Sequence, residues 1–191
     1  MSQPSQALAN ILDNDSLIAA IDQGLAPQYL YFWGHRQKVE GKPDKSCFSQ
    51  WFEAGFKEQG LHYPSAEHYM MAGKARLFDD QATLAKILAA RTPAEAKKLG
   101  REVAGYDDAA WVAERSAIVE QANLLKFEQN PGLRTFLLST AGQVLVEASP
   151  LDSIWGIGLD AKAAQAADPR QWQGLNLLGY ALMRVRERLA G

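Results

Sequence analysis

Helix-start signals recur along the middle of this chain and constrain its fold more than any other feature of the sequence. A Ser, Thr, Asp or Asn side chain can accept an unpaired N–H of a helix's first turn, and proline suits the first helical position. Such residues precede good helix-forming stretches at four places, which are Pro64-Ser65, Thr92-Pro93, Asp107 and Asn130-Pro131. These signals predict helices over 65–78, 92–104, 109–128 and 131–140. The fold should therefore be mainly α.

Shorter patterns complete the predicted fold. Aromatic and β-branched residues predict two strands of a small sheet, at 28–33 and 143–148. A stretch containing Gly, Pro and Asp indicates a hairpin-type loop over 38–45. Further helices are expected over 81–90 and 176–189. The predicted fold class is mainly α, of the α+β type.

The length of 191 residues suits one well-packed domain and is short for two. No repeat or low-complexity linker divides the chain. Residues 1–27, rich in Ser, Gln, Asn and Asp, indicate an N-terminal extension with one short helix. We expect a single compact helical domain with a small β-sheet over 28–191.

The net charge of −2 and the pI near 5.9 do not indicate a broad surface for nucleic acid or for a membrane. No apolar run reaches the roughly 20 residues that span a bilayer. Residues 1–12 lack the basic start and apolar core of a signal peptide. We therefore expect a soluble, cytoplasmic protein.

Metal binding is not indicated by the spacing of the possible ligands. The three histidines, His35, His62 and His68, match no zinc-site spacing, and Cys47, the only cysteine, has no CxxC partner. The single cysteine also excludes an internal disulfide. The Gly156-Ile157-Gly158 run is too short for a dinucleotide-binding fingerprint. No metal or organic cofactor is expected.

The predicted helix 65–78 carries an acid and an amine on one face. Glu67 and Lys74 are seven residues apart, about two helical turns. Glu67 also lies in the first turn, where the helix dipole favours the ionised carboxylate. The pair is a candidate catalytic site. The alternative is that both side chains are solvent-exposed, since residues at i,i+7 cannot pair across one turn.

Two other segments combine aromatic and polar residues. In the loop 152–156, which follows the second predicted strand, an acid, an indole and a glycine lie close together. An indole can stack on a planar ring, and a glycine lets a ligand approach the backbone. Residues 46–52 alternate aromatic and small polar side chains. Each segment could line a pocket, or could simply be a turn or part of the core.

The motifs, taken in order, resemble those of the YbiA-like NADAR superfamily, named for its association with NAD and ADP-ribose. The matching pieces span about 30–190 and are Phe48-Ser49-Gln50-Trp51, Pro64-Ser65-Ala66-Glu67-His68-Tyr69 with Lys74, Gly100-Arg101, Lys126-Phe127-Glu128-Gln129, Asp152-x-x-Trp155-Gly156 and Gly174-x-Asn176-x-Leu178-Gly179. The extension 1–27 and an insertion at 161–173 have no counterpart in the shortest members. Both could reshape the pocket.

The resemblance implies an N-glycosidase that needs no cofactor, since water is its only co-reactant. It implies Glu67 and Lys74 as the catalytic pair, with Asp152, Trp155 and Asn176 completing the site. Further candidates for binding the base or the phosphate are Gly156, Trp51, Ser49, Arg36, Arg101 and Lys126. Glu67 could stabilise the positive charge that develops at C1′, and Lys74 could condense with the C1′ aldehyde. Asp152 could hold a sugar hydroxyl or protonate the departing base.

Three functions remain open at this stage. The first is hydrolysis of phosphoribosylamino-pyrimidines, which are early riboflavin-pathway intermediates. The second is removal of ADP-ribose from guanine, either in a nucleotide or in nucleic acid. The third is a catalytically silent ADP-ribose-binding module. The weakly acidic chain favours a small-molecule partner over a duplex. The sequence does not indicate an oligomeric state.

Overall fold

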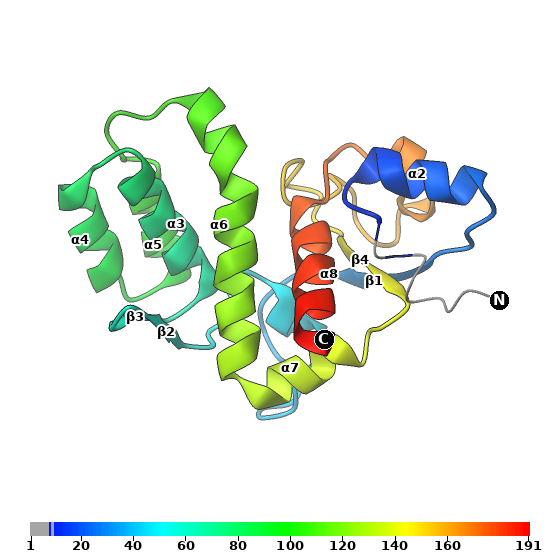
Figure 1. Cartoon of the computed structure of the whole chain (residues 1–191), viewed down its shortest axis with the longest axis horizontal. Helices are drawn as coiled ribbons and strands as arrows, with labels where there is room; N and C mark the ends of the chain where they lie inside the picture. The colour runs from blue at the N-terminus through cyan, green and yellow to red at the C-terminus, as the bar shows by residue number, and fades with distance from the viewer. Residues whose placement is uncertain (1–7, 9) are drawn as a thin grey trace. The chain divides into compact units, whose positions relative to one another are not determined.

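The structure, a computed structural model, describes Leu8 and residues 10–191 (Figure 1). Within this part of the chain the fold is mainly α, as predicted, with two small sheets where one was expected. The elements are α2 (Asn14–Asp22), β1 (Gln28–Phe32), β2 (Phe56–Glu58), β3 (Leu61–Tyr63), α3 (Ala66–Leu77), α4 (Gln81–Ala89), α5 (Pro93–Gly100), α6 (Asp108–Gln129), α7 (Pro131–Leu138), β4 (Gln143–Glu147) and α8 (Leu177–Ala190). Three short 3₁₀ turns are η1 (Lys45–Phe48), η2 (Ala164–Ala167) and η3 (Pro169–Gln171).

The described chain forms two compact units. Residues 34–134 make up the first, here called the helical unit. Leu8, residues 10–33 and residues 135–191 make up the second, here called the sheet unit. α7 begins in the helical unit and ends in the sheet unit.

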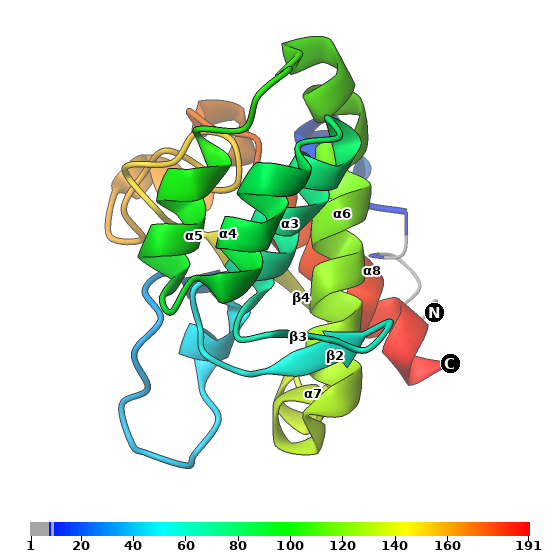
Figure 2. The same ribbon diagram turned by 90° about the vertical axis from the view of Figure 1, so that its left-hand side faces the viewer.

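In the helical unit, α3 is the central element and packs against α4, α5 and α6 (Figure 2). Gly100, at the end of α5, lies directly against α3. A Cβ atom at Gly100 would lie 2.0 Å from the Met71 Sδ atom. Only glycine lets the two helices approach this closely.

β2 and β3 form an antiparallel hairpin whose turn residues, Gln59 and Gly60, both have positive φ. Such a turn twists in the same sense as the strands that it joins. Residues 38–44 form a loop, as predicted, but the hairpin type was wrong, because no strand flanks that segment directly. The real turn has Gln59 where Asn or Asp more commonly precedes the glycine, so the usual hairpin signal is weak.

The helix boundaries agree with the prediction to within two residues, except at the end of α5. This helix ends at Gly100 and not at 104. The Ala104 N–H donates to Asp80 Oδ2 (2.9 Å), while Asp80 Oδ1 accepts from the Thr83 N–H (2.9 Å) at the start of α4. The Asp80 carboxylate thus caps α4 and also anchors the segment that follows α5.

The sheet unit is organised around β1 and β4, which pair in parallel from Gln28↔Gln143 to Phe32↔Glu147. Both strands were predicted, and α8 packs along β4 (Figure 1). α2 confirms the short helix expected within 1–27 and contacts η3. No helix of the described chain is both long and apolar enough to cross a membrane.

Candidate functional site

Glu67 lies in the first turn of α3, and its surroundings fix that turn. Its side chain is only 2% exposed, so the alternative of a solvent-exposed acid is wrong. The Glu67 N–H donates to the Gln50 carbonyl (2.9 Å). Ser65, the N-cap, accepts from the His68 N–H (3.4 Å). The predicted helix start therefore places a buried carboxyl group on α3.

The His68 ring ties this first turn to α4. His68 Nε2 lies 3.2 Å from the Ala90 carbonyl, which can only accept, so Nε2 carries the proton. His68 Nδ1 then accepts from the Ser65 hydroxyl (2.7 Å). Burial lowers the pKa of His68, so the imidazole is neutral at neutral pH.

Lys74 lies two turns further along α3, in a partly buried aromatic setting. Its Nζ atom donates to the Gly100 carbonyl (2.9 Å). The same atom lies 4.3 Å from the centre of the Tyr106 ring and 5.7 Å from that of Trp111. Desolvation lowers the pKa of Lys74, which raises its fraction of neutral, nucleophilic amine. Neither aromatic residue was predicted as part of a site, because nothing but their residue type pointed to it.

Two polar residues of α6 hold the segment that contains Ser49 and Gln50. Lys126 Nζ donates to the carbonyls of Cys47 (2.6 Å) and Ser49 (3.0 Å). Asn123 Nδ2 donates to Gln50 Oε1 (2.8 Å). Since the Gln50 carbonyl accepts from Glu67, α6 fixes the backbone that adjoins the first turn of α3.

The amides of Gln50 and Asn123 are not fully used by these contacts. Both side chains are buried, and Gln50 Nε2 and Asn123 Oδ1 have no hydrogen-bond partner among the described residues. A buried polar group without a partner costs about 1–3 kcal/mol. The two amides therefore leave one donor and one acceptor for a further group, such as a water molecule or a substrate.

Lys126 is fully buried, and its burial lowers its pKa from 10.5 to about 8. Replacing Lys126 with Met should lower the free energy of unfolding at pH 7 by about 2–4 kcal/mol, because two carbonyls lose their donor. The unfolded chain binds the proton more tightly than the folded chain between pH 8 and about 10.5. The stability of the wild type relative to K126M should therefore increase by about 1–2 kcal/mol from pH 7 to pH 9.5. Urea denaturation at both pH values measures this. If the difference in free energy of unfolding between the wild type and K126M were equal or smaller at pH 9.5 than at pH 7, the prediction would be wrong.

The other predicted residues of the helical unit lie nearer its surface. Trp51 is half-buried, and the centre of its ring lies 5.7 Å from the centre of the His35 ring. Lys97 Nζ lies 5.8 Å from the centre of the Trp51 ring. Arg36 is exposed. Arg101 is also exposed and immediately follows Gly100, whose carbonyl accepts from Lys74.

In the sheet unit, Asp152 shapes the loop 152–156. Its Oδ1 atom accepts from the N–H groups of Ile154 (2.9 Å) and Trp155 (2.7 Å). Its Oδ2 atom has no hydrogen bond within the described chain. Asp152 and Trp155 are half-buried, and Gly156 is buried. The loop thus keeps a carboxylate oxygen and part of an indole available for a ligand.

This loop is held by the segment 173–178 through backbone hydrogen bonds. Leu175, Asn176 and Leu178 donate their N–H groups to the carbonyls of Ser153 (3.0 Å), Gly156 (3.1 Å) and Trp155 (3.1 Å). Gly174 packs against the same loop. A Cβ atom at Gly174 would lie 2.2 Å from the Gly156 carbonyl oxygen.

Gly174→Ala should lower the free energy of unfolding by about 3 kcal/mol or more, because the added methyl group would meet rigid backbone atoms. Gly132→Ala is a matched control. Its Cβ atom would lie 3.6 Å from Pro43 Cγ, an ordinary contact, and alanine favours the helix α7. Chemical denaturation compares the two variants. Equal stability would show that the Gly174 contact has no energetic weight.

Asn176 is buried and lies between β4 and α8, with a left-handed φ of 52°. Its Oδ1 atom accepts from the Glu147 N–H (2.9 Å), and its Nδ2 group donates to the Leu145 carbonyl (3.0 Å). Both ends of the amide therefore contact the backbone of β4 and fix the position of the loop that precedes α8.

The predicted residues belong to both units. Glu67, Lys74 and their neighbours are in the helical unit, whereas the loop 152–156 and Asn176 are in the sheet unit. Within the described chain no group of three or more His, Cys, Asp or Glu residues could hold a metal ion. The Cys47 thiol is buried, and burial raises its pKa to about 12, so it is protonated at neutral pH.

Comparison with known proteins gives consistent matches. Residues 31–190 match the NADAR domain family. The chain is 42% identical over 165 residues to N-glycosidase R617 of Acanthamoeba polyphaga mimivirus, covering 84% of this chain and 95% of that protein. It is 34% identical over 147 residues to N-glycosidase YbiA of Escherichia coli K12, covering 77% and 81%. The NMR structure of E. coli YbiA has a TM-score of 0.67 and 28% identity, covering 87% of both chains.

A plant protein matches a smaller part. The chain is 35% identical over 136 residues to the chloroplastic riboflavin biosynthesis protein PYRR of Zea mays. The match covers 68% of this chain and 20% of that protein.

Proposed function

Because this chain belongs to the NADAR family of N-glycosidases, as its motifs predicted, we propose that it hydrolyses phosphoribosylamino-pyrimidines. The bond cleaved would be the C–N bond between ribose 5-phosphate and the base of an early riboflavin-biosynthesis intermediate. The observation that carries the proposal is the buried Glu67 carboxyl group on the same helix as the desolvated Lys74. The similarity to the maize riboflavin biosynthesis protein supports this substrate class.

Glu67 would act on the developing cation. As the C1′–N bond breaks, its electron pair moves to the base nitrogen and positive charge grows on C1′ and the ring oxygen. A carboxylate in a desolvated site stabilises such charge more strongly than one in water. A proton passes to the departing base, and water finally supplies the oxygen at C1′. Glu67 is therefore proposed as the main catalytic group.

Lys74 would act on the sugar as the base leaves. Its neutral amine would add to C1′, and opening of the ribose ring, with the amine proton passing to the ring oxygen, would give an imine. Hydrolysis of the imine returns the free amine and the sugar. The lowered pKa of Lys74 supports this role, since only the neutral amine attacks.

Roles for the remaining residues follow from their exposure and contacts. The half-buried Trp155 ring is proposed to stack on the base, with the half-buried Trp51 ring as the alternative. Asp152, with its available Oδ2 atom, is proposed to hold a sugar hydroxyl or to protonate the base. The exposed Arg36 and Arg101 are the proposed phosphate ligands. Lys126, Ser49 and Asn176 would contribute by fixing backbone, as their hydrogen bonds indicate.

A product assay tests the proposal. The purified protein would be incubated separately with the two early riboflavin-pathway intermediates and with ADP-ribosylated guanosine. Release of ribose 5-phosphate alone is the expected result. Release of ADP-ribose alone would overturn the proposed substrate class and favour the alternative function, which is removal of ADP-ribose from guanine. No release, with ADP-ribose bound, would leave only the silent binding module.

A further inference from the structure

We infer that Asn14, in the helix of the N-terminal extension, is a positioning residue for the loop 152–156. The inference rests on the proposed function in one respect, because in that function Trp155 of this loop stacks on the base. All the residues involved belong to the sheet unit.

The loop depends on the segment 173–178 for its position. It contains no helix or strand of its own, and backbone N–H groups of that segment hold four of its carbonyls. Gly174 lies in contact with the loop backbone, without a side chain between them. A shift of Gly174 would therefore pass directly to Gly156 and its neighbours.

Asn14 holds Gly174 from the other side. Asn14 Nδ2 donates to the Gly174 carbonyl (3.0 Å). Because a carbonyl can only accept, this contact fixes the orientation of the amide. Asn14 Oδ1 then accepts from the hydroxyl group of Tyr180 (2.9 Å), a buried residue of α8. One side chain thus connects α2, the Gly174 backbone and α8.

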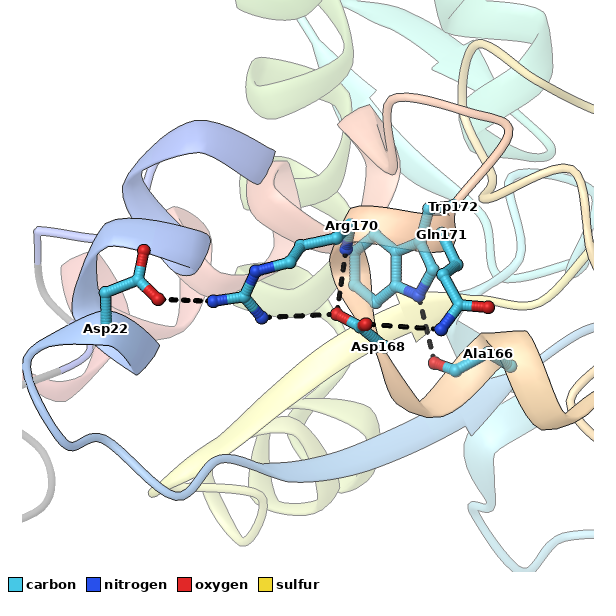
Figure 3. Close-up of polar contacts among 6 residues, drawn as sticks. All are labelled: Asp22, Ala166, Asp168, Arg170, Gln171 and Trp172. Atoms are coloured by element: carbon cyan, nitrogen blue, oxygen red, sulfur yellow. Dashed lines mark hydrogen bonds and ion pairs between the residues drawn. The ribbon is translucent and has the colours of Figure 1, made fainter.

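α2 is itself well anchored. Its N-terminus has a capping box formed by Asp13 and Ser16, and Leu17 is fully buried. At its other end, Asp22 forms an ion pair with Arg170 of η3. Figure 3 shows how Asp168 joins this pair through Arg170 and also accepts from Gln171. The extension and the insertion 161–173 therefore contact each other, and the insertion ends immediately before Gly174.

Asn14→Asp is the test variant. Aspartate keeps the size of the side chain and an acceptor for Tyr180, and an acid favours the first turn of α2. It replaces the donor to Gly174 with a carboxylate oxygen that repels the carbonyl. We expect KM to rise about five- to tenfold and kcat to stay within twofold. General destabilisation would do the opposite, since a smaller folded fraction lowers apparent kcat and leaves KM unchanged.

Asp22→Asn is the matched control on the same helix. It removes an exposed ion pair, whose side chains are 65% and 42% exposed, and does not contact Gly174. Such pairs contribute about 0–1 kcal/mol, so KM should stay at the wild-type value. A wild-type KM in N14D, or the same rise in D22N, would overturn the inference.

Amide hydrogen exchange separates this inference from the proposed function. Exchange of the Leu175, Asn176 and Leu178 N–H groups should speed up in N14D and not in D22N. This readout needs no substrate, so it holds even if no tested compound is hydrolysed. Uniformly faster exchange throughout the sheet unit would reduce Asn14 to a general stabilising contact and overturn its positioning role.

Discussion

Glu67→Gln should lower kcat by about three orders of magnitude and leave the fold intact. Glutamine has the same shape, and the backbone contacts of the first turn, Glu67 N–H to Gln50 and His68 N–H to Ser65, do not involve the carboxylate. What is lost is the negative charge opposite the developing cation at C1′. Steady-state kinetics with the phosphoribosylamino-pyrimidine measures the change, with circular dichroism to verify the helices.

Glu95→Gln is the matched control for this variant. Glu95 also lies in the first turn of a helix, α5, but it is exposed and caps the Arg91 N–H (2.8 Å). Loss of the Glu95 carboxylate in E95Q should change kcat by less than about twofold. If E67Q retained more than about a tenth of the wild-type kcat, Glu67 would not be the group that stabilises the cation.

Lys74→Met should abolish borohydride trapping of the sugar and lower kcat by about two orders of magnitude. Methionine keeps the apolar stem beside Tyr106 and Trp111 but cannot form an imine. The wild-type trapping rate should rise with pH and level off below the ordinary lysine value of 10.5, because desolvation lowers the pKa of Lys74. Mass spectrometry of the reduced adduct measures both the loss of trapping and the pH dependence of the trapping rate. Steady-state kinetics measures kcat.

Lys98→Met, on the exposed face of α5, provides the control for charge removal. The K98M variant should have the wild-type rate of borohydride trapping and the wild-type kcat. Full activity in K74M would remove the imine step from the mechanism. Trapping that persists in K74M would assign the adduct to another lysine.

The sequence was sufficient to predict much of the helical unit. The start of α3 depends on Ser65 and its neighbours, so a local signal places Glu67 and Lys74 on one helix. Their burial was not predictable in the same way. Glu67 is buried because Gln50 and the α6 residues that hold it come from distant parts of the chain. The same residue types on a surface helix would give the same local pattern.

Asn176 illustrates a limit of another kind. A motif identifies an amide at this position but does not indicate what the amide contacts. Its two hydrogen bonds go to the backbone of β4, which exists only when β4 and α8 have come together. Similarly, the cation of Lys126 donates to two carbonyls of a segment far away in the sequence. Composition could suggest a phosphate ligand there, but only the fold reveals the carbonyls.

The parallel pairing of β1 with β4 has a consequence for the order in which the protein forms. The entire helical unit lies between these two strands in the chain. On the ribosome, β1 therefore emerges early but cannot pair with β4 until residues 34–134 and β4 itself have been synthesised. The contacts of α3 with α4, α5 and α6 all lie within residues 34–134, so the helical unit can form as it emerges, whereas pairing over the longer separation between β1 and β4 is slow. Glu67 and Lys74 would then be in their helix before the loop that carries Asp152 has been translated.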